Sequence, residues 1–359
     1  MPVDQNDDED NFEEIQSEID DKETDLAPYK LITYGADYTL QVLVDKLEAE
    51  DIIVPPFQRK YIWPLVKASK LIESFLLGLP VPQIFLYKEV DTETLTVVDG
   101  QQRLRTIQYF FNEIFKERAF RLLNVKQQWE GKKYTELKAN EQRRLRDSIL
   151  RATIFQQTDP NDNSSIFEVF ERLNTGGMTL REQEIRNCVI RGNINSFLEG
   201  LNNYPTWRNL FGNVQIDTRM RDIEMILRFF ALYDNLDNYS KPMKDFLTLF
   251  MRGKKNLSED EKSNYETIFK QTMDFINEKI GPRAFRIRTG INIAVFDAIS
   301  VSLAKLDLSG LSDVKENFEL LISDTDFIDL VSVHTTDKDK VIQRISLATR
   351  YFQNEVHSS

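Results

Sequence analysis

The spacing of apolar residues changes near residue 160, and this change constrains the fold more than any other feature of the sequence. From Leu31 to about Asp159, stretches with helical spacing alternate with short β-branched stretches that are typical of strands. From Ser164 onward, apolar residues recur three and four positions apart and strand signals nearly vanish. We therefore predict an α+β protein, with an α/β domain over residues 27–160 and an all-helical domain over residues 161–359.

Turn signals separate the predicted elements of the first domain. Helical spacing covers residues 40–47, 63–77, 107–114 and 136–149, and strand-like stretches cover 52–54, 83–90, 95–98, 120–125 and 152–156. The polar turn at 91–94 predicts a β-hairpin. In the second domain, Thr179 followed by Glu182 predicts a capping box, and Ser258 before Glu259 and Glu261 predicts another helix start.

The first 26 residues carry most of the negative charge. They contain twelve acids and one base, Lys22, for a net charge of −11, whereas the rest of the chain has a net charge of −1. High charge and few apolar residues predict a disordered tail over residues 1–26. A solvated solubility tail is the simpler interpretation, and a tail that mimics nucleic acid and shields a basic groove is the alternative.

Cysteine and histidine usage excludes several classes of protein. A single cysteine, Cys188, permits no intramolecular disulfide and no cysteine-based zinc cluster, and its amphipathic context predicts a buried thiol. Two histidines, His334 and His357, are too few for a histidine-rich metal nuclease centre. No secretory signal and no membrane-spanning run is visible, so we expect a cytoplasmic protein.

Two short segments carry polar residues in places where a scaffold does not need them. In VPPFQRKYIW, residues 54–63, two prolines force an extended chain before Gln58 and Arg59. In VVDGQQRLRT, residues 97–106, a strand ends at Asp99, Gly100 permits a tight turn, and a helix begins.

The helix start in the second segment is suited to an anion. The backbone N–H groups of Gln101, Gln102 and Arg103 have no partner within the helix, and the helix dipole favours negative charge there. Arg103 would pair with a phosphate, and Asp99 would hold Mg²⁺ or orient a water molecule. The alternative is ordinary turn chemistry, in which Asp99 caps the helix and Arg103 pairs with Asp99 or a nearby glutamate.

Other features remain open between structure and function. Asn174, Gly176 and Gly177 form either a helix C-cap or a turn whose backbone donors reach a nucleotide. Residues 103–151 have a net charge of +7, consistent with a DNA-backbone contact or with a solvated helix face. Trp129 and Tyr134 within this stretch either stack on an exposed base or belong to the core. The basic cluster at 282–288 has no evident place.

Four segments, taken together and in order, resemble one known family. They are VPPFQRKYIW, LIESFLLGLPVPQIFL at 71–86, VVDGQQRLRTI at 97–107 and FERLNTGGMTLREQEIRNCVI at 170–190. They are similar to the N-terminal domain of GmrSD-type modification-dependent restriction endonucleases, within the ParB/sulfiredoxin-like superfamily. The resemblance covers roughly residues 40–190 and implies a compact α/β unit followed by helices.

The resemblance also implies a site. The family's DGQQR motif, which is associated with nucleoside triphosphate binding and hydrolysis, falls on residues 99–103, and its P-x-Q-R segment falls on Pro56, Gln58 and Arg59. The resemblance thus implies catalytic roles for Asp99, Gln102 and Arg103, and nucleotide binding by Gly100 and Gln101 together with Gln58 and Arg59. The family's asparagine-glycine turn falls on residues 174–177. Where the sulfiredoxin branch has a reactive cysteine, this sequence has Gln101 and Gln102, which excludes peroxide reduction.

Long members of the family continue into an HNH nuclease domain, and no such motif surrounds His334 or His357. We therefore expect an NTP- and Mg²⁺-dependent sensor subunit of a phage-defence restriction system, with DNA and a separate HNH-type nuclease as partners. The alternative is a non-catalytic DNA-binding or protein-interaction adaptor that uses the same pocket only for ligand sensing. A third hypothesis is a regulator whose acidic tail competes with DNA.

Overall fold

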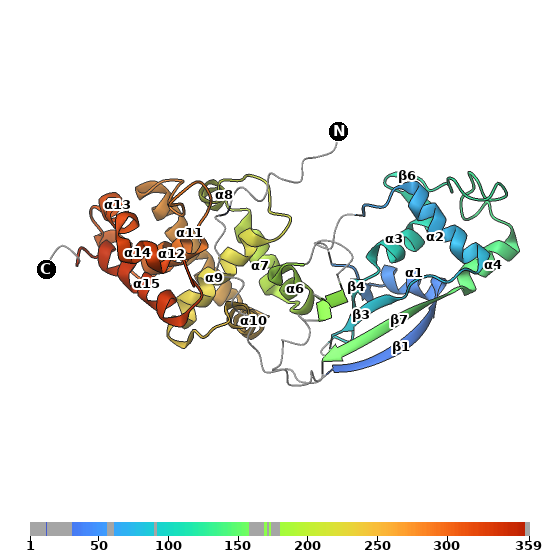
Figure 1. The fold of residues 1–359 in the computed structure, drawn as a ribbon, viewed down its shortest axis with the longest axis horizontal. Coiled ribbons are helices and arrows are strands. Elements are labelled where there is room, and N and C mark those ends of the chain that lie inside the picture. The colour runs from blue at the N-terminus through green and yellow to red at the C-terminus, as the bar shows by residue number, and fades with distance from the viewer. Residues whose placement is uncertain are drawn as a thin grey trace. The chain divides into compact units, whose positions relative to one another are not determined.

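The computed structural model describes residue 12 and residues 31–55, 61–89, 92–157, 169–170, 172–173 and 180–355. Its contacts divide the chain into two compact units, residues 27–180 and residues 1–26 together with 181–359. The first unit combines a sheet with helices and the second is helical, which confirms the predicted α+β class (Figure 1). The domain boundary predicted at residue 160 lies among residues outside the described ranges.

The first unit is built on a sheet whose five described strands have the order β1-β7-β3-β4-β2. The strands are β1 (Leu31–Thr39), β2 (Ile52–Ile53), β3 (Ile84–Lys88), β4 (Leu95–Asp99) and β7 (Ile149–Gln157). The predicted hairpin is present, because β3 and β4 pair antiparallel. Since β2 pairs parallel with β4, the chain leaves β2 toward the same end of the sheet at which β4 ends at Asp99.

Four helices supply the rest of the core of this unit. They are α1 (Leu40–Glu48), α2 (Leu65–Leu77), α3 (Gln101–Phe111) and α4 (Ala139–Asp147). Each contributes a fully buried apolar residue to a cluster shared with the strands: Leu43, Ile72, Ile107 and Leu145. Helix α2 ends where the sequence predicts, at Gly78 in the left-handed conformation, but it begins at Leu65 because Pro64 occupies the N-cap.

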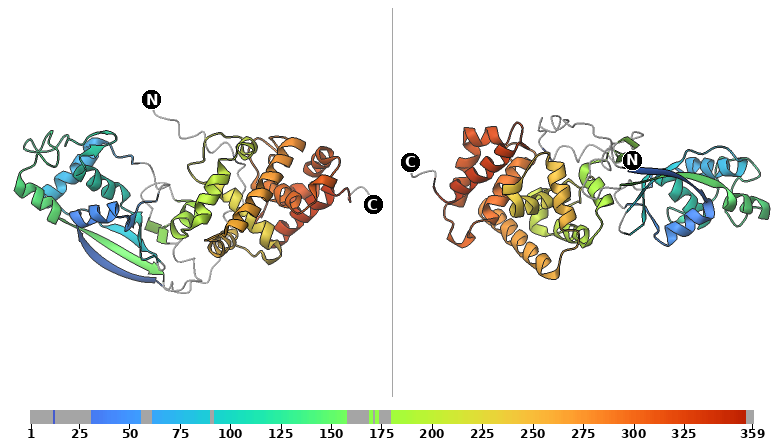
Figure 2. Two further views of the ribbon diagram at one scale, coloured as in Figure 1. Left: turned by 180° about the vertical axis from the view of Figure 1, so that it is seen from behind. Right: turned by 90° about the horizontal axis from the view of Figure 1, so that it is seen from below.

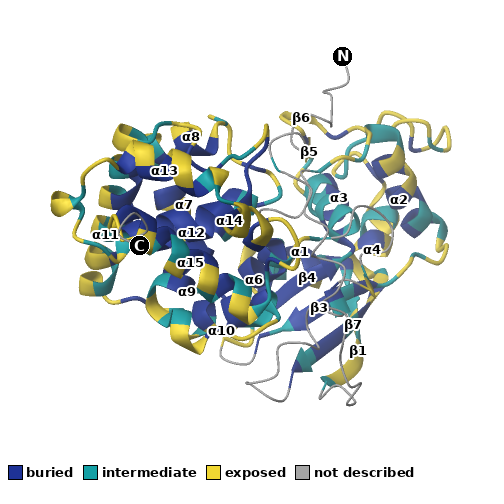
Figure 3. Cartoon of the chain, turned by 60° about the vertical axis from the view of Figure 1, so that its left-hand side comes forward, coloured by how far each residue is buried: buried dark blue, intermediate teal, exposed yellow. Residues whose placement is uncertain are grey.

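Two elements of this unit differ from the sequence prediction. The strand predicted at 120–125 is wrong: these residues form a loop, preceded by the two-residue strands β5 (Ile114–Phe115) and β6 (Arg118–Ala119). Phe120 and Leu122 are apolar because they fill the core as loop residues, not because they pair in a sheet. Strand β1 was not predicted; it is an edge strand paired along its whole length with β7, and much of it is exposed (Figures 2 and 3).

The second unit consists of helices α6–α15. Their bounds are α6 (Glu182–Val189), α7 (Asn193–Asn202), α8 (Pro205–Phe211), α9 (Arg221–Asn235), α10 (Met243–Gly253), α11 (Glu259–Lys279), α12 (Ile293–Ala304), α13 (Val314–Ser323), α14 (Thr325–Leu330) and α15 (Lys338–Phe352), with short 3₁₀ turns at Leu236–Asn238 and Leu308–Gly310. None of the helices in the described part of the chain combines the length and apolar content needed to cross a membrane.

One of the two predicted helix caps is confirmed. The Ser258 hydroxyl accepts from the backbone N–H of Glu261 at 3.2 Å, as the capping box at the start of α11 requires. The cap predicted from Thr179 and Glu182 is wrong, because α6 has Arg181 at its N-cap and the Glu184 carboxylate accepts from the Arg181 N–H at 2.6 Å. Thr179 itself lies outside the described residues.

Buried ion pairs connect the helices of the second unit. Asp297 of α12 accepts from both Arg228 of α9, at 2.6 Å, and Arg344 of α15, at 2.7 Å. Arg186 of α6 is fully buried and pairs with Glu224 of α9 at 3.0 Å. Because uncompensated charges are costly in a protein interior, these pairs fix the positions of the helices relative to one another within this unit.

Two sequence features of this unit have structural roles. Cys188 is buried in α6, as predicted, and burial raises the pKa of its thiol well above the ordinary value. Within the basic cluster at 282–288, Arg286 donates to the carbonyl oxygens of Leu210, at 2.9 Å, and Phe211, at 2.7 Å, at the end of α8. Arg286 therefore satisfies helix carbonyls that otherwise lack partners.

Candidate functional site

The junction between β4 and α3 is built around Gly100. This residue has φ +99°, in the left-handed region, and a Cβ atom added to it would lie 2.4 Å from Cγ2 of Ile84. Glycine is therefore required here both by backbone conformation and by close packing against β3. The chain turns at this one residue. The side chains of Asp99, at the end of the strand, and Arg103, in the first turn of the helix, therefore lie next to each other.

Arg103 is held at this junction by two acceptors. Its Nη2 donates to Oδ2 of Asp99 at 2.8 Å and to the backbone carbonyl of Gln83 at 3.0 Å. The Arg103 side chain is 16% exposed and that of Asp99 is 41% exposed. The ion pair is therefore exposed to solvent on the Asp99 side. Its presence agrees with the interpretation of the sequence in which Arg103 pairs with Asp99.

Asp99 does not cap the helix. Gly100, which has no side chain to accept a hydrogen bond, occupies the N-cap, and the first turn of α3 contains no acidic residue. The Nε of Arg103 is buried and has no hydrogen-bond partner in the described structure. A buried N–H donor without an acceptor costs about 1–3 kcal/mol, so an anion that reached Nε would recover this free energy.

Gln102 connects the site to the segment that follows β2. Its Oε1 accepts from the backbone N–H groups of Ile62, at 3.1 Å, and Trp63, at 3.3 Å. The Tyr61 hydroxyl lies 2.8 Å from the Thr106 hydroxyl of α3, and burial raises the pKa of Tyr61 to about 12. The end of the extended segment at 54–63 is thereby fixed against the first turns of α3.

Several predicted site residues lie outside the described ranges. These are Gln58 and Arg59 of the extended segment and Asn174, Gly176 and Gly177 of the glycine turn. The described residues on both sides of residues 56–60 lie near the junction, since β2 leads toward the Asp99 end of the sheet and Ile62 bonds to Gln102. Gln101, the first residue of α3, is half-buried. The structure thus brings together Asp99, Gly100, Gln101, Gln102 and Arg103.

A metal ion at this site would depend on one carboxylate. In the described parts of the chain, no group of three or more histidine, cysteine, aspartate or glutamate side chains is placed to hold a metal ion. Asp99 can offer one carboxylate oxygen, which suits an ion such as Mg²⁺ that takes one or two protein carboxylates and completes its shell with phosphate oxygens and water.

The basic stretch at 103–151 is partly used within the fold. Arg121 pairs with Glu136 at 2.9 Å and Arg151 pairs with Asp37 at 3.0 Å. Trp129 is 4% exposed and donates its Nε1 to Glu141 at 2.8 Å, so it belongs to the core. Tyr134 is half-buried against the ring of Phe111, with 4.8 Å between ring centroids.

Two contacts at the site could not be found by reading the sequence. The Gln83 carbonyl that accepts from Arg103 is 20 residues away in the chain, and the backbone N–H of Ile62 is 40 residues from Gln102. Both depend on strand order and on how the segment after β2 returns to the sheet. The one signal in the sequence is that Gln83 is the first residue of a predicted strand, 83–90.

Part of the chain matches a known protein family. Residues 40–191 match the family model described as the GmrSD restriction endonuclease, N-terminal domain. The match covers the sheet strands β2, β3, β4 and β7, the DGQQR junction and helix α6. A search of curated protein sequences finds no match to this chain.

Proposed function

Residues 40–191 form a domain of the GmrSD restriction-endonuclease N-terminal family, and from this premise we propose that the chain is a nucleoside-triphosphate-hydrolysing subunit of a restriction system. The nucleotide binds at the junction of β4 and α3. Its triphosphate contacts the backbone N–H groups at the start of α3 and the guanidinium of Arg103. The helical unit, residues 181–359, contacts DNA or a separate nuclease.

The observation that supports this site best is that Arg103 has a buried hydrogen-bond donor without an acceptor. Its Nη2 is satisfied by Asp99 and Gln83, while its buried Nε has no acceptor. A cation in the first turn of a helix is unfavourable unless an anion is near, and here one neighbouring anion, Asp99, is 41% exposed and engages one nitrogen. A phosphate oxygen that came within reach of Nε would give this nitrogen the charge-assisted hydrogen bond that it lacks.

The residues at the junction have separate tasks in this mechanism. Arg103 binds phosphate oxygens and stabilises the charge that develops on the transferred phosphoryl group. Asp99 contributes a carboxylate oxygen to Mg²⁺, which when bound neutralises phosphate charge. Gln102 holds Ile62 and Trp63, at the end of the extended segment, through its side-chain oxygen. Gln58 and Arg59 of the same segment are the further phosphate-binding residues in this proposal.

The Asp99–Arg103 ion pair also favours a second candidate, in which the chain binds nucleotide without hydrolysing it. In that case Asp99 serves to hold Arg103 rather than a metal ion, and the chain acts as an adaptor that senses nucleotide. Binding without turnover distinguishes this candidate from the enzyme.

The test is phosphate release by the full chain with Mg²⁺ and each of ATP, GTP, CTP and UTP, in the presence and absence of DNA. The proposed enzyme releases phosphate from at least one nucleotide, and Arg103→Ala abolishes the release. Arg105→Ala is the matched control, because Arg105 is on the same helix, two positions after Arg103 and five after Gly100. Release that is equal in wild type and Arg103→Ala would contradict the site.

A further inference from the structure

One residue of the acidic N-terminal segment, Phe12, is seated on the helical unit. Its ring and that of Phe211 form an edge-type pair with 5.7 Å between centroids, and the guanidinium of Arg221 lies over the Phe12 ring, 4.3 Å from its centroid. Its backbone forms a parallel bridge with Ile291. An aromatic ring between a second ring and a guanidinium is a specific contact and not a loose association.

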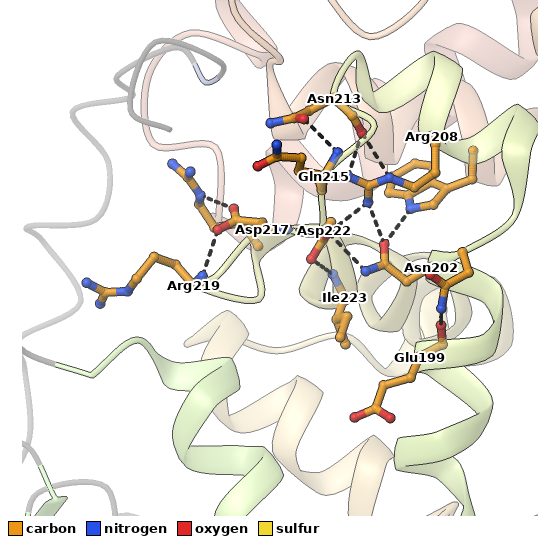
Figure 4. Close-up of polar contacts among 12 residues, drawn as sticks. Glu199, Asn202, Arg208, Asn213, Gln215, Asp217, Arg219, Asp222 and Ile223 are labelled. Atoms are coloured by element: carbon orange, nitrogen blue, oxygen red, sulfur yellow. Dashed lines mark hydrogen bonds and ion pairs between the residues drawn. The ribbon is translucent and has the colours of Figure 1, made fainter. Parts of the chain in front are cut away.

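Arg221, which lies over the Phe12 ring, is held by a hydrogen-bond network. Asp217 accepts from Nε of Arg221 at 2.5 Å and from the backbone N–H of Arg219 at 2.7 Å. The backbone N–H of Asp217 donates to Asp222 at 3.0 Å, and Asp222 pairs with Arg208 at 2.8 Å (Figure 4). Arg221 is therefore held in place by the fold of its own unit.

The same network holds a loop that presents apolar side chains to solvent. Arg208 donates from Nε to the carbonyl of Asn213 at 2.9 Å and also bonds the carbonyl of Gln215 (Figure 4). The side chains of Val214 and Ile216, on either side of Gln215, are 90% and 51% exposed. A loop with a fixed backbone and exposed apolar side chains is typical of an interaction surface.

Arg286 adds positive charge beside the residues that contact Phe12. Arg286 donates to the Phe211 carbonyl at 2.7 Å, which places the basic cluster at 282–288 beside the residues that receive Phe12. Phe12 itself lies in a segment with twelve acids and one base. The segment and the surface therefore have complementary charge.

We propose that this surface, formed by Phe211, Arg221 and Ile291 with the neighbouring arginines, is a docking site for an acidic segment with an aromatic anchor, and that residues 1–26 occupy it in cis. Because the segment is covalently attached, its effective concentration at the site is high, on the order of millimolar. A segment of the same chemistry supplied in trans meets a site that is already occupied. The acidic segment is thus a tethered ligand of the helical unit.

The test uses full-length chains and a fluorescent peptide of residues 1–26, with fluorescence anisotropy as the measurement. The peptide binds the Phe12→Ala chain at least about tenfold more tightly than it binds wild type, because the variant has lost its own anchor. A peptide that itself carries Phe12→Ala binds the Phe12→Ala chain at least about tenfold more weakly than the wild-type peptide does.

Variants of the receiving surface complete the test. In the Phe12→Ala background, Arg221→Lys keeps the charge but loses the planar contact, and it weakens peptide binding. Arg350→Ala, which removes an exposed arginine of α15 from the same unit, is the matched control and leaves binding unchanged. The proposal is overturned if the wild-type and Phe12→Ala peptides bind the Phe12→Ala chain equally well, since the Phe12 ring would then contribute nothing to peptide binding. It is also overturned if neither peptide binds the Phe12→Ala chain.

Discussion

The carboxylate of Asp99 and the guanidinium of Arg103 lie on opposite sides of Gly100 and form an ion pair of 2.8 Å across the β4–α3 junction. The pair leaves the Nε of Arg103 buried without an acceptor, while Asp99 remains accessible to solvent. Because Arg103 still has a donor without an acceptor and Asp99 is exposed, a ligand anion can take part in this ion pair. The pair of Asp297 with Arg344 is fully buried and is suited only to hold helices together.

Replacement of Gly100 tests whether the junction depends on glycine. Gly100→Ala places a Cβ atom 2.4 Å from Cγ2 of Ile84 and requires φ +99° of an L-residue. We expect a loss of unfolding free energy of about 2–4 kcal/mol, measured by urea denaturation. Gly35→Ala is the matched control, because a Cβ atom there meets nothing within 4 Å, and it should change stability by less than about 1 kcal/mol. Equal effects of the two substitutions would contradict this explanation.

Gln102 is predicted to act as an acceptor that holds the extended segment. Gln102→Ala removes the oxygen that accepts from Ile62 and Trp63, and we expect it to lower the unfolding free energy by about 1–2 kcal/mol. Gln102→Glu retains an acceptor at the same position and should remain closer to wild type. Thermal unfolding of the two variants measures the difference, and a Glu variant as unstable as the Ala variant would count against the acceptor role.

Asp297 is predicted to be essential for the stability of the helical unit. Asp297→Asn leaves Arg228 and Arg344 in the interior without their shared carboxylate, and we expect a loss of about 3–5 kcal/mol in urea denaturation. Asp37→Asn breaks the exposed pair with Arg151 and serves as the comparison, with a loss below about 1 kcal/mol. A loss at Asp297 no larger than that at Asp37 would show that the buried network contributes little.

Glu113 is predicted to make stability depend on acidic pH. Hydrogen bonds from the hydroxyl of Thr135, at 2.5 Å, and from its backbone N–H, at 2.8 Å, lower the pKa of Glu113 below its ordinary value of 4.5. A pKa that is lower in the folded state stabilises the protein above 4.5, and this contribution is lost as the pH falls through the folded value. Glu113→Gln should therefore reduce the fall in stability between pH 5 and the acid limit of folding, as measured by urea denaturation at each pH. An unchanged pH profile would contradict the assignment.

The spacing of apolar residues and the turn residues predict most of the helices and strands, whereas the remaining elements depend on tertiary contacts. The spacing of apolar residues gave helices such as α9 and α11, and Gly78 marked the end of α2, because these depend on neighbours in the chain. Strand β1 was missed because its outward residues Ile32 and Tyr34 are apolar and exposed, so alternation of polar and apolar residues is weak there.

In the candidate site, too, the sequence predicts the local features but not the contacts between residues that are distant in the chain. Asp99, Gly100 and Arg103 could be placed together from the sequence, because a strand, a glycine turn and a helix start are local features. The acceptor for Arg103 on Gln83 and the donors to Gln102 on Ile62 and Trp63 come from other parts of the sheet unit, and no local pattern contains them. The sequence does not decide between a core role and a base-stacking role for Trp129 for the same reason, since only the fold shows it buried against Glu141.

Equilibrium binding of each nucleoside triphosphate with Mg²⁺, measured by titration calorimetry on the full chain, tests the proposed nucleotide site most directly. The site predicts that wild type binds at least one nucleotide, that Arg103→Ala weakens this binding by about 100-fold, and that Arg105→Ala binds like wild type. Circular dichroism should be the same for all three chains. Binding by Arg103→Ala as tight as that of wild type, or the absence of binding by wild type to all four nucleotides, would contradict it.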